Sequence, residues 1–210
     1  QPCALPLFVP LLAQGLALRE LARIGDAARH MLEGVLKALV QETGHEAELL
    51  PLEEKVDRLS REVLVYVAKL PQDTPALPLL KAASELEHLA DLAKRALRKA
   101  ERLWTQGVTF SPEGKAELAR IVERTLARLE RALTALATGN RALAERVLAE
   151  YPEVLAAVEA SRGAHLRRLR DRVETRASTL THLDLLLLLE ELNLGVNRLA
   201  RLVEEIHKEG

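Results

Sequence analysis

Apolar residues recur at alternating steps of four and three along most of the chain, which is the period of an amphipathic α-helix. Stripes of this kind run through residues 18–39, 52–70, 79–104, 118–136 and 185–206. A further helix is expected over about 141–170, bent or interrupted at Pro152, because proline lacks the N–H that a helix interior needs. No alternating run of β-branched residues competes as a strand. The pattern predicts an all-α protein of six helices.

The chain divides into two similar halves. A Thr-Gly pair ends the first helix of each half, and a proline lies early in each second helix: Thr43-Gly44 and Pro51, then Thr138-Gly139 and Pro152. Three helices joined by short connections form an antiparallel bundle. We therefore expect two antiparallel three-helix bundles side by side, over residues 14–106 and 111–208. Residues 1–13 are expected to be an apolar arm or linker.

Composition narrows the class of protein. Hydrophobic residues make up 48% and charged residues 29%, which indicates a globular chain rather than a disordered one. A net charge of −1 with only 2% aromatic residues argues against a nucleic-acid partner. The single cysteine, Cys3, fits a reducing compartment. The chain begins at Gln1 and its only methionine is Met31, so we infer a piece of a longer protein.

Two acidic pairs stand out on the expected second and third helices. Glu53 and Asp57, like Glu87 and Asp91, are four residues apart and lie on one face of their helix. If the two helices are neighbours, the four carboxylates face one concavity, where a hard or borderline cation would relieve their repulsion. Ordinary surface ion pairs are the alternative, because Lys94 and other bases follow at helical spacing.

Three segments carry a resemblance to a known family: ALRELARIGDAARHML (17–32), ELEHLADLAKRAL (85–97) and HLDLLLLLEELNLGVNRLA (182–200). Over about residues 17–206 the chain resembles the PhoU family. It looks most like the cytoplasmic PhoU-like domain of bacterial sodium–phosphate cotransporters. The resemblance implies two three-helix bundles whose acidic pairs bind metal, with iron, zinc, manganese or magnesium undetermined. It places the ligands at Glu53, Asp57, Glu87 and Asp91.

The second half departs from that family pattern. Tyr151 and Leu155 stand where the fifth helix should supply acids, and Leu194 replaces the aspartate that should follow Glu190. We expect the second metal site to be lost. The basic run over residues 165–176 is interpreted as a solvated helix end, with contact to anionic headgroups or phosphate as the alternative.

These observations predict a non-enzymatic regulatory domain in phosphate transport. Its expected partner is a membrane transporter domain, in cis or in trans, at the cytoplasmic face of the cell membrane; a homodimer is left open. One alternative is a di-iron carboxylate oxidase, because Glu85-x-x-His88 and Glu204-x-x-His207 match the ligand spacing of such bundles. The other is a purely structural helical module that oligomerises.

Overall fold

The computed structural model describes residues 5–43, 46–72, 74–171 and 174–208, and all regular structure in them is helical. The six predicted helices are present, and the fifth is divided in two at Glu150, just before Pro152. The helices are α1 (Leu5–Gln41), α2 (Glu46–Val67), α3 (Ala76–Thr105), α4 (Pro112–Thr138), α5 (Arg141–Ala149), α6 (Tyr151–Arg170) and α7 (Arg176–Ile206).

Several helix ends follow directly from local sequence. Ser111 caps α4 by accepting a hydrogen bond from the Gly114 N–H at 3.1 Å, and Pro112 occupies the first helical position. Gly139 ends α4 with φ of 70°, a left-handed conformation that glycine adopts without strain. At α7, Thr175 and Ser178 form a capping box.

Two boundaries differ from the sequence prediction. The predicted arm, residues 1–13, is helical from Leu5 onward and continuous with α1; residues 1–4, including Cys3, lie outside the described residues. The apolar stripe of the last helix was expected from residue 185, but α7 already begins at Arg176, where Thr175 and Ser178 form a capping box. Gly44, expected to help end the first helix, also lies outside the described residues.

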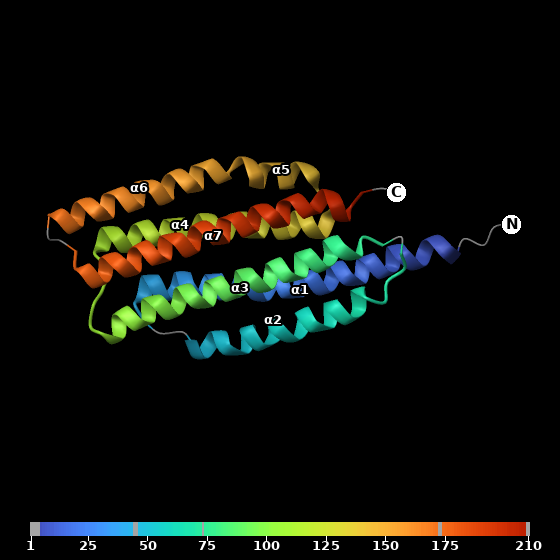
Figure 1. The fold of residues 1–210 in the computed structure, drawn as a ribbon, viewed down its shortest axis with the longest axis horizontal. Helices are drawn as coiled ribbons and strands as arrows, with labels where there is room; N and C mark the ends of the chain where they lie inside the picture. The colour runs from blue at the N-terminus through green and yellow to red at the C-terminus, as the bar shows by residue number, and fades with distance from the viewer. Residues whose placement is uncertain (1–4, 44–45, 73, 172–173, 209–210) are drawn as a thin grey trace.

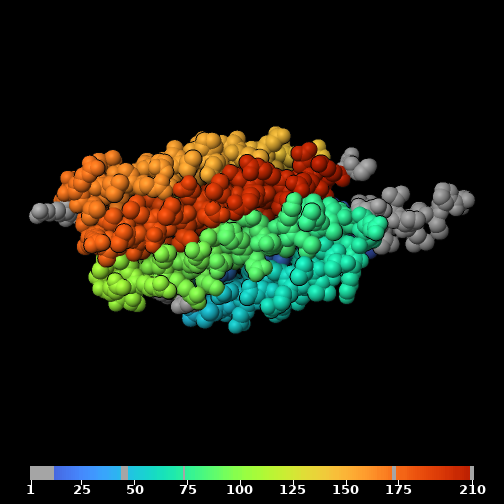
Figure 2. All heavy atoms as spheres, viewed as in Figure 1, coloured from blue at the N-terminus to red at the C-terminus, as the bar shows by residue number. Residues whose placement is uncertain are grey.

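The helices form two three-helix bundles that lie side by side, as predicted. Figure 1 shows α1, α2 and α3 in one half and α4, α7 and the α5–α6 pair in the other. Helix α3 packs on α7 and α1 packs on α4, so α2 and α6 lie on the outer sides. Figure 2 shows α3 and α7 adjacent along the middle of one face. Helix α1 begins and α7 ends at the same end of the molecule (Figure 1).

One hydrophobic core runs through both bundles. It includes fully buried leucines from both halves, such as Leu21 and Leu89 in the first and Leu118 and Leu199 in the second. A Cβ on Gly195 of α7 would lie 2.5 Å from Leu89 Cδ2 of α3, so the two helices approach closely there. The bundles therefore share a packed interface instead of being joined by a linker alone. Within the described residues, no helix has the length and apolar character needed to cross a bilayer.

Candidate functional site

The predicted metal ligands lie where α2 and α3 pack together, but a lysine occupies half of the site. Lys94 of α3 forms an ion pair with Glu53 of α2 and lies 3.7 Å from Asp91 on its own helix. Its ammonium group therefore takes the place that a cation would take between these two carboxylates. In this arrangement the four predicted ligands do not form one four-carboxylate site.

The other two acids lie beside a cavity. Asp57 and Glu87 line a hollow of about 410 Å³ between α2 and α3, together with Arg61. Arg61 follows Asp57 at helical spacing, but no ion pair joins the two side chains among the described residues. Ser60 lines the same cavity, and its buried hydroxyl has no hydrogen-bond partner in the described part of the chain. Leaving a buried hydroxyl without a hydrogen-bond partner costs free energy. The cavity has room for a water or an ion that would provide this partner.

The corresponding positions in the second bundle have other roles. Glu190 of α7 accepts a hydrogen bond from Arg162 of α6 at 3.3 Å. Leu155 and Leu194 are half-buried, and the ring of Tyr151 lies 5.6 Å from the guanidinium of Arg128. Of these four positions only Glu190 provides a carboxylate, and it is already paired with Arg162.

The residues proposed for a di-iron centre are engaged elsewhere. Glu85 accepts two hydrogen bonds from Arg198, at 2.9 and 3.0 Å, and His88 lies 3.5 Å from Glu191. His207 contacts the Leu136 carbonyl at 2.7 Å, near the end of α4. Among the described residues, no group of three or more histidine, cysteine, aspartate or glutamate side chains is placed to hold a metal.

A buried arginine in the second bundle was not anticipated from the sequence. Arg128 of α4 is only 1% exposed and donates to the Val147 carbonyl at 2.9 Å, in the last turn of α5. It also donates to the side-chain oxygens of Asn193, at 2.5 Å, and Asn197. Burial lowers the pKa of Arg128 to about 10, which still leaves it charged at neutral pH. The two asparagines, four residues apart in a leucine-rich helix, were the sequence signal for this network.

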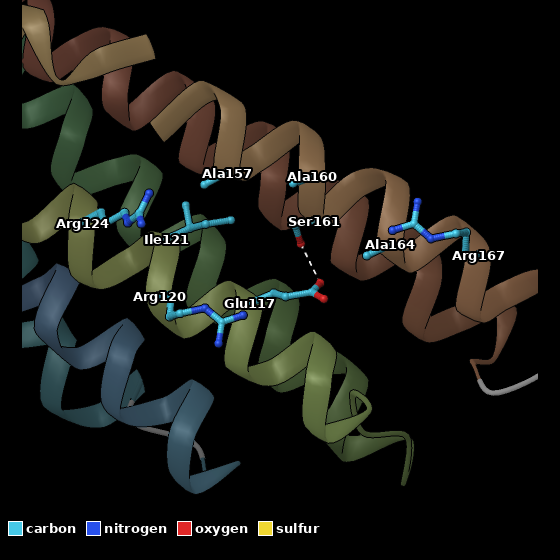
Figure 3. Close-up of a pocket in the computed structure, with 9 residues that line it drawn as sticks. All are labelled: Glu117, Arg120, Ile121, Arg124, Ala157, Ala160, Ser161, Ala164 and Arg167. Carbon is cyan, nitrogen blue, oxygen red and sulfur yellow. Dashed lines mark hydrogen bonds between the residues drawn. The ribbon is translucent and has the colours of Figure 1, made fainter. Parts of the chain in front are cut away.

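A second buried polar network lies where α4 begins and α6 ends. Arg168 donates to both oxygens of Glu117, at 2.8 and 3.0 Å. Figure 3 shows the hydrogen bond that Ser161 donates to Glu117 at 2.9 Å. Burial acts to raise the pKa of Glu117, but the hydrogen bonds from Arg168 and Ser161 outweigh it, so the pKa is lowered overall. The acid is therefore ionised and fully engaged.

The histidine in this network is neutral and faces Ser161. Burial lowers the pKa of His182 to about 3, and its Nε2 lies 3.0 Å from Ser161 Oγ. Because the serine proton points to Glu117, the Nε2–H of His182 must donate to the serine. A nucleophilic serine requires the opposite, a histidine that accepts its proton. The geometry gives Ser161 a structural role.

Comparisons with known proteins agree with this architecture. Residues 19–100 match the family model "PhoU domain". The chain is 29% identical over 196 residues to "Putative inorganic phosphate export protein YjbB" of Salmonella typhimurium and 28% identical to the protein of that name from Escherichia coli K12. Each match covers 89% of this chain and 36% of the relative, so the chain spans about a third of the length of these relatives.

Solved structures show the same fold. PhoU from Pseudomonas aeruginosa superposes with a TM-score of 0.83 at 18% identity, covering 92% of this chain and 97% of that one. The phosphate transport system regulatory protein PhoU from Streptococcus pneumoniae gives 0.78 at 16% identity, covering 94% and 97%. The chain is therefore similar to the PhoU domain over residues 19–100, and it shares the fold of the solved PhoU proteins along almost its whole length.

Proposed function

We propose that this chain is the regulatory domain of a longer phosphate-transporting membrane protein and lies at the cytoplasmic face of the membrane. The observation that supports this most is the match along 89% of the chain to a part, 36%, of proteins named for inorganic phosphate export. The remaining length of such relatives can accommodate a transporter domain. The PhoU fold supports a regulatory role, since one neighbour with this fold is itself named a phosphate transport regulator.

The transporter is proposed to be a sodium–phosphate symporter or a phosphate exporter of related architecture. The sequence motifs favour the symporter, and the names of the relatives favour export. Measuring both uptake and efflux of radioactive phosphate, with and without a sodium gradient, separates the two. Sodium-driven uptake would support the symporter, and sodium-independent efflux would support the exporter.

The domain is proposed to act as one body against its partner. Any sliding of one bundle on the other would disturb the close approach of Gly195 to Leu89 and the Glu85–Arg198 ion pair, both of which join α3 to α7. Packed interfaces resist continuous deformation. The regulatory change is therefore assigned to contact between the domain and the transporter, and not to a hinge between the bundles.

Deleting residues 19–206 from the full-length protein tests this role. We expect phosphate transport to persist but to lose its response to the phosphate supply of the cell. The control is a full-length protein with the same tag and matched membrane abundance. Transport that responds to phosphate equally well in the deletion and the control would contradict the proposal. Iron-dependent oxygen consumption by the chain would instead favour the oxidase alternative.

The predicted metal site remains a proposal and narrows to Asp57 and Glu87. Their carboxylates and the unpartnered hydroxyl of Ser60 offer oxygen ligands, which suit magnesium or manganese with several waters retained. The metal would neutralise the two acids and fasten α2 to α3 at this cavity.

Metal analysis of matched variants tests the narrowed site. The double variant D57N/E87Q should lose bound metal, whereas E53Q/D91N should retain it, because Lys94 already neutralises that pair. Both variants remove two charges from the same helix contact. Equal metal content in D57N/E87Q and the unmodified chain would remove the site.

A further inference from the structure

A groove with an apolar floor lies between α4 and α6 of the second bundle. It has a volume of about 340 Å³ and its floor is formed by small and apolar side chains from both helices (Figure 3). Ala157, Ala160 and Ala164 of α6 face it, and their small side chains leave the space between the helices open. Ile121 of α4 completes the apolar floor. A volume of this size is within the range of small-molecule sites.

Three arginines border this floor. Arg120 and Arg124 come from α4, and Arg167 comes from α6 (Figure 3). All three are exposed, and none makes a hydrogen bond or ion pair with another described residue. Each guanidinium offers five N–H donors in a planar fork that matches carboxylate or phosphate oxygens. By contrast, Arg162 and Arg168 of α6 are each paired with a carboxylate.

The one acid in the groove does not offset this charge. Both Glu117 oxygens are engaged by Arg168, and one also accepts from Ser161. Arg168, outside the groove lining, pairs with both Glu117 and Glu174. The lining itself carries the three positive charges of Arg120, Arg124 and Arg167 against the single negative charge of Glu117. Like charges at this spacing on a helix repel one another, and a bound anion removes that repulsion.

We propose that the groove between α4 and α6 binds a phosphate group through Arg120, Arg124 and Arg167, with its apolar floor under the rest of the molecule that carries it. The charge and the shape of the groove call for an anion with several acceptor oxygens; the choice of phosphate among such anions rests on the proposed function. The phosphate is either free in solution, as inorganic phosphate or a simple monoester, or part of an anionic lipid headgroup.

Binding measurements on the 210-residue chain distinguish these sources. Calorimetric titration with inorganic phosphate and glycerol 3-phosphate tests the soluble source. Co-sedimentation with phosphatidylcholine vesicles, with and without phosphatidylglycerol, tests the lipid source. We expect binding in one of these arms at physiological salt, where non-specific attraction between exposed charges is largely screened. Absence of binding in every arm would overturn the proposal.

Matched variants locate the binding. The triple variant R120Q/R124Q/R167Q should weaken it at least about tenfold, because each lost charge-assisted hydrogen bond contributes a factor of this order. Glutamine has nearly the helix propensity of arginine, so the helices should persist, which circular dichroism checks. The control R19Q/R95Q/R102Q removes three exposed positive charges outside the groove and should bind like the unmodified chain. Equal affinity in the two triple variants would overturn the groove assignment.

Failure of this site and failure of the proposed function give different results. The deletion of residues 19–206 addresses regulation as a whole, whereas the groove variant leaves the fold in place. A groove variant with unchanged phosphate and vesicle binding, in a protein whose deletion abolishes regulation, overturns the groove and leaves the regulatory role standing.

Discussion

Replacing the buried Arg128 should lower or raise the free energy of unfolding, depending on whether its hydrogen-bond partners are present. Arg128 is 1% exposed and no carboxylate contacts it among the described residues; its partners are carbonyl oxygens of Val147, Asn193 and Asn197. The double variant N193L/N197L replaces the two side-chain acceptors with apolar groups of similar shape, and it also removes the hydrogen bond that Asn193 Nδ2 donates to Thr125 Oγ1 at 2.8 Å. It leaves a buried charge with the Val147 carbonyl as its main remaining partner.

The magnitude follows from the number of contacts removed. A hydrogen bond to a charged group contributes about 1.5–3 kcal/mol, so losing two should cost roughly 3–5 kcal/mol, close to the cost of breaking a buried ion pair. For a chain of this length, each kcal/mol lowers the melting temperature by about 2–4 °C. The double variant should therefore melt roughly 6–20 °C lower than the unmodified chain.

Replacing Arg128 itself should then lower the free energy of unfolding of the unmodified chain and raise that of the double variant. In the otherwise unmodified chain, R128M leaves three buried oxygens without their donor and should destabilise by roughly 2 kcal/mol or more. In the N193L/N197L background, R128M removes a buried charge that has lost its side-chain acceptors, and it should raise the free energy of unfolding by about 2 kcal/mol or more. The assay is urea unfolding of all four proteins by circular dichroism. If R128M changes the free energy of unfolding by the same amount in both backgrounds, within about 0.5 kcal/mol, the reasoning is refuted.

Three further predictions concern the α3–α7 interface between the bundles and the hydrogen-bond network of Glu117. G195V should lower stability by about 1–3 kcal/mol, because its Cβ would lie 2.5 Å from Leu89 Cδ2, whereas G15V, with nothing within 4 Å, is the control and should be near neutral in thermal unfolding. R198M should cost less than about 1 kcal/mol in urea unfolding, since the arginine side chain is 41% exposed; a larger loss would mean that the interface depends on the ion pair more than on packing. The lowered pKa of Glu117 means that its ionised form stabilises the fold above about pH 4.5 and that this contribution is lost as pH falls through the folded pKa. The stability difference between E117Q and the unmodified chain, measured from pH 7 to pH 3, should therefore shrink on acidification, and a constant difference would contradict the assignment.

Local chemistry accounts for the parts of the fold that the sequence predicted well. Pro152 divides the fifth helix because it lacks an N–H, and Ser111 and Gly139 bound α4 through their own side-chain and backbone conformations. Each of these signals acts within a few residues along the chain. The stripe of apolar residues likewise depends only on helical period, which is why both bundles could be anticipated.

Contacts between helices were harder to predict, because spacing on one helix does not say which residue of another helix faces it. Lys94 was recognised as a neighbour of Asp91 on α3, but its ion pair with Glu53 of α2 depends on how the two helices are placed side by side. The same holds for Arg128. An arginine is almost never fully buried without partners, and the oxygens that accept its hydrogen bonds come from α5 and α7.

The buried polar groups are distributed unevenly, and the distribution bears on function. In the described part of the chain, the first bundle buries only Ser60 and Thr74 among polar residues, whereas the second buries Arg128, His165, His182 and several others. Buried polar networks stabilise little, but they fix how helices sit against one another. In the second bundle they join α4 to α5, α6 and α7, and so they hold the α4 and α6 sides of the arginine-bordered groove in one arrangement. Because these polar contacts hold the two sides of the groove in one arrangement, a ligand would meet a preformed surface there.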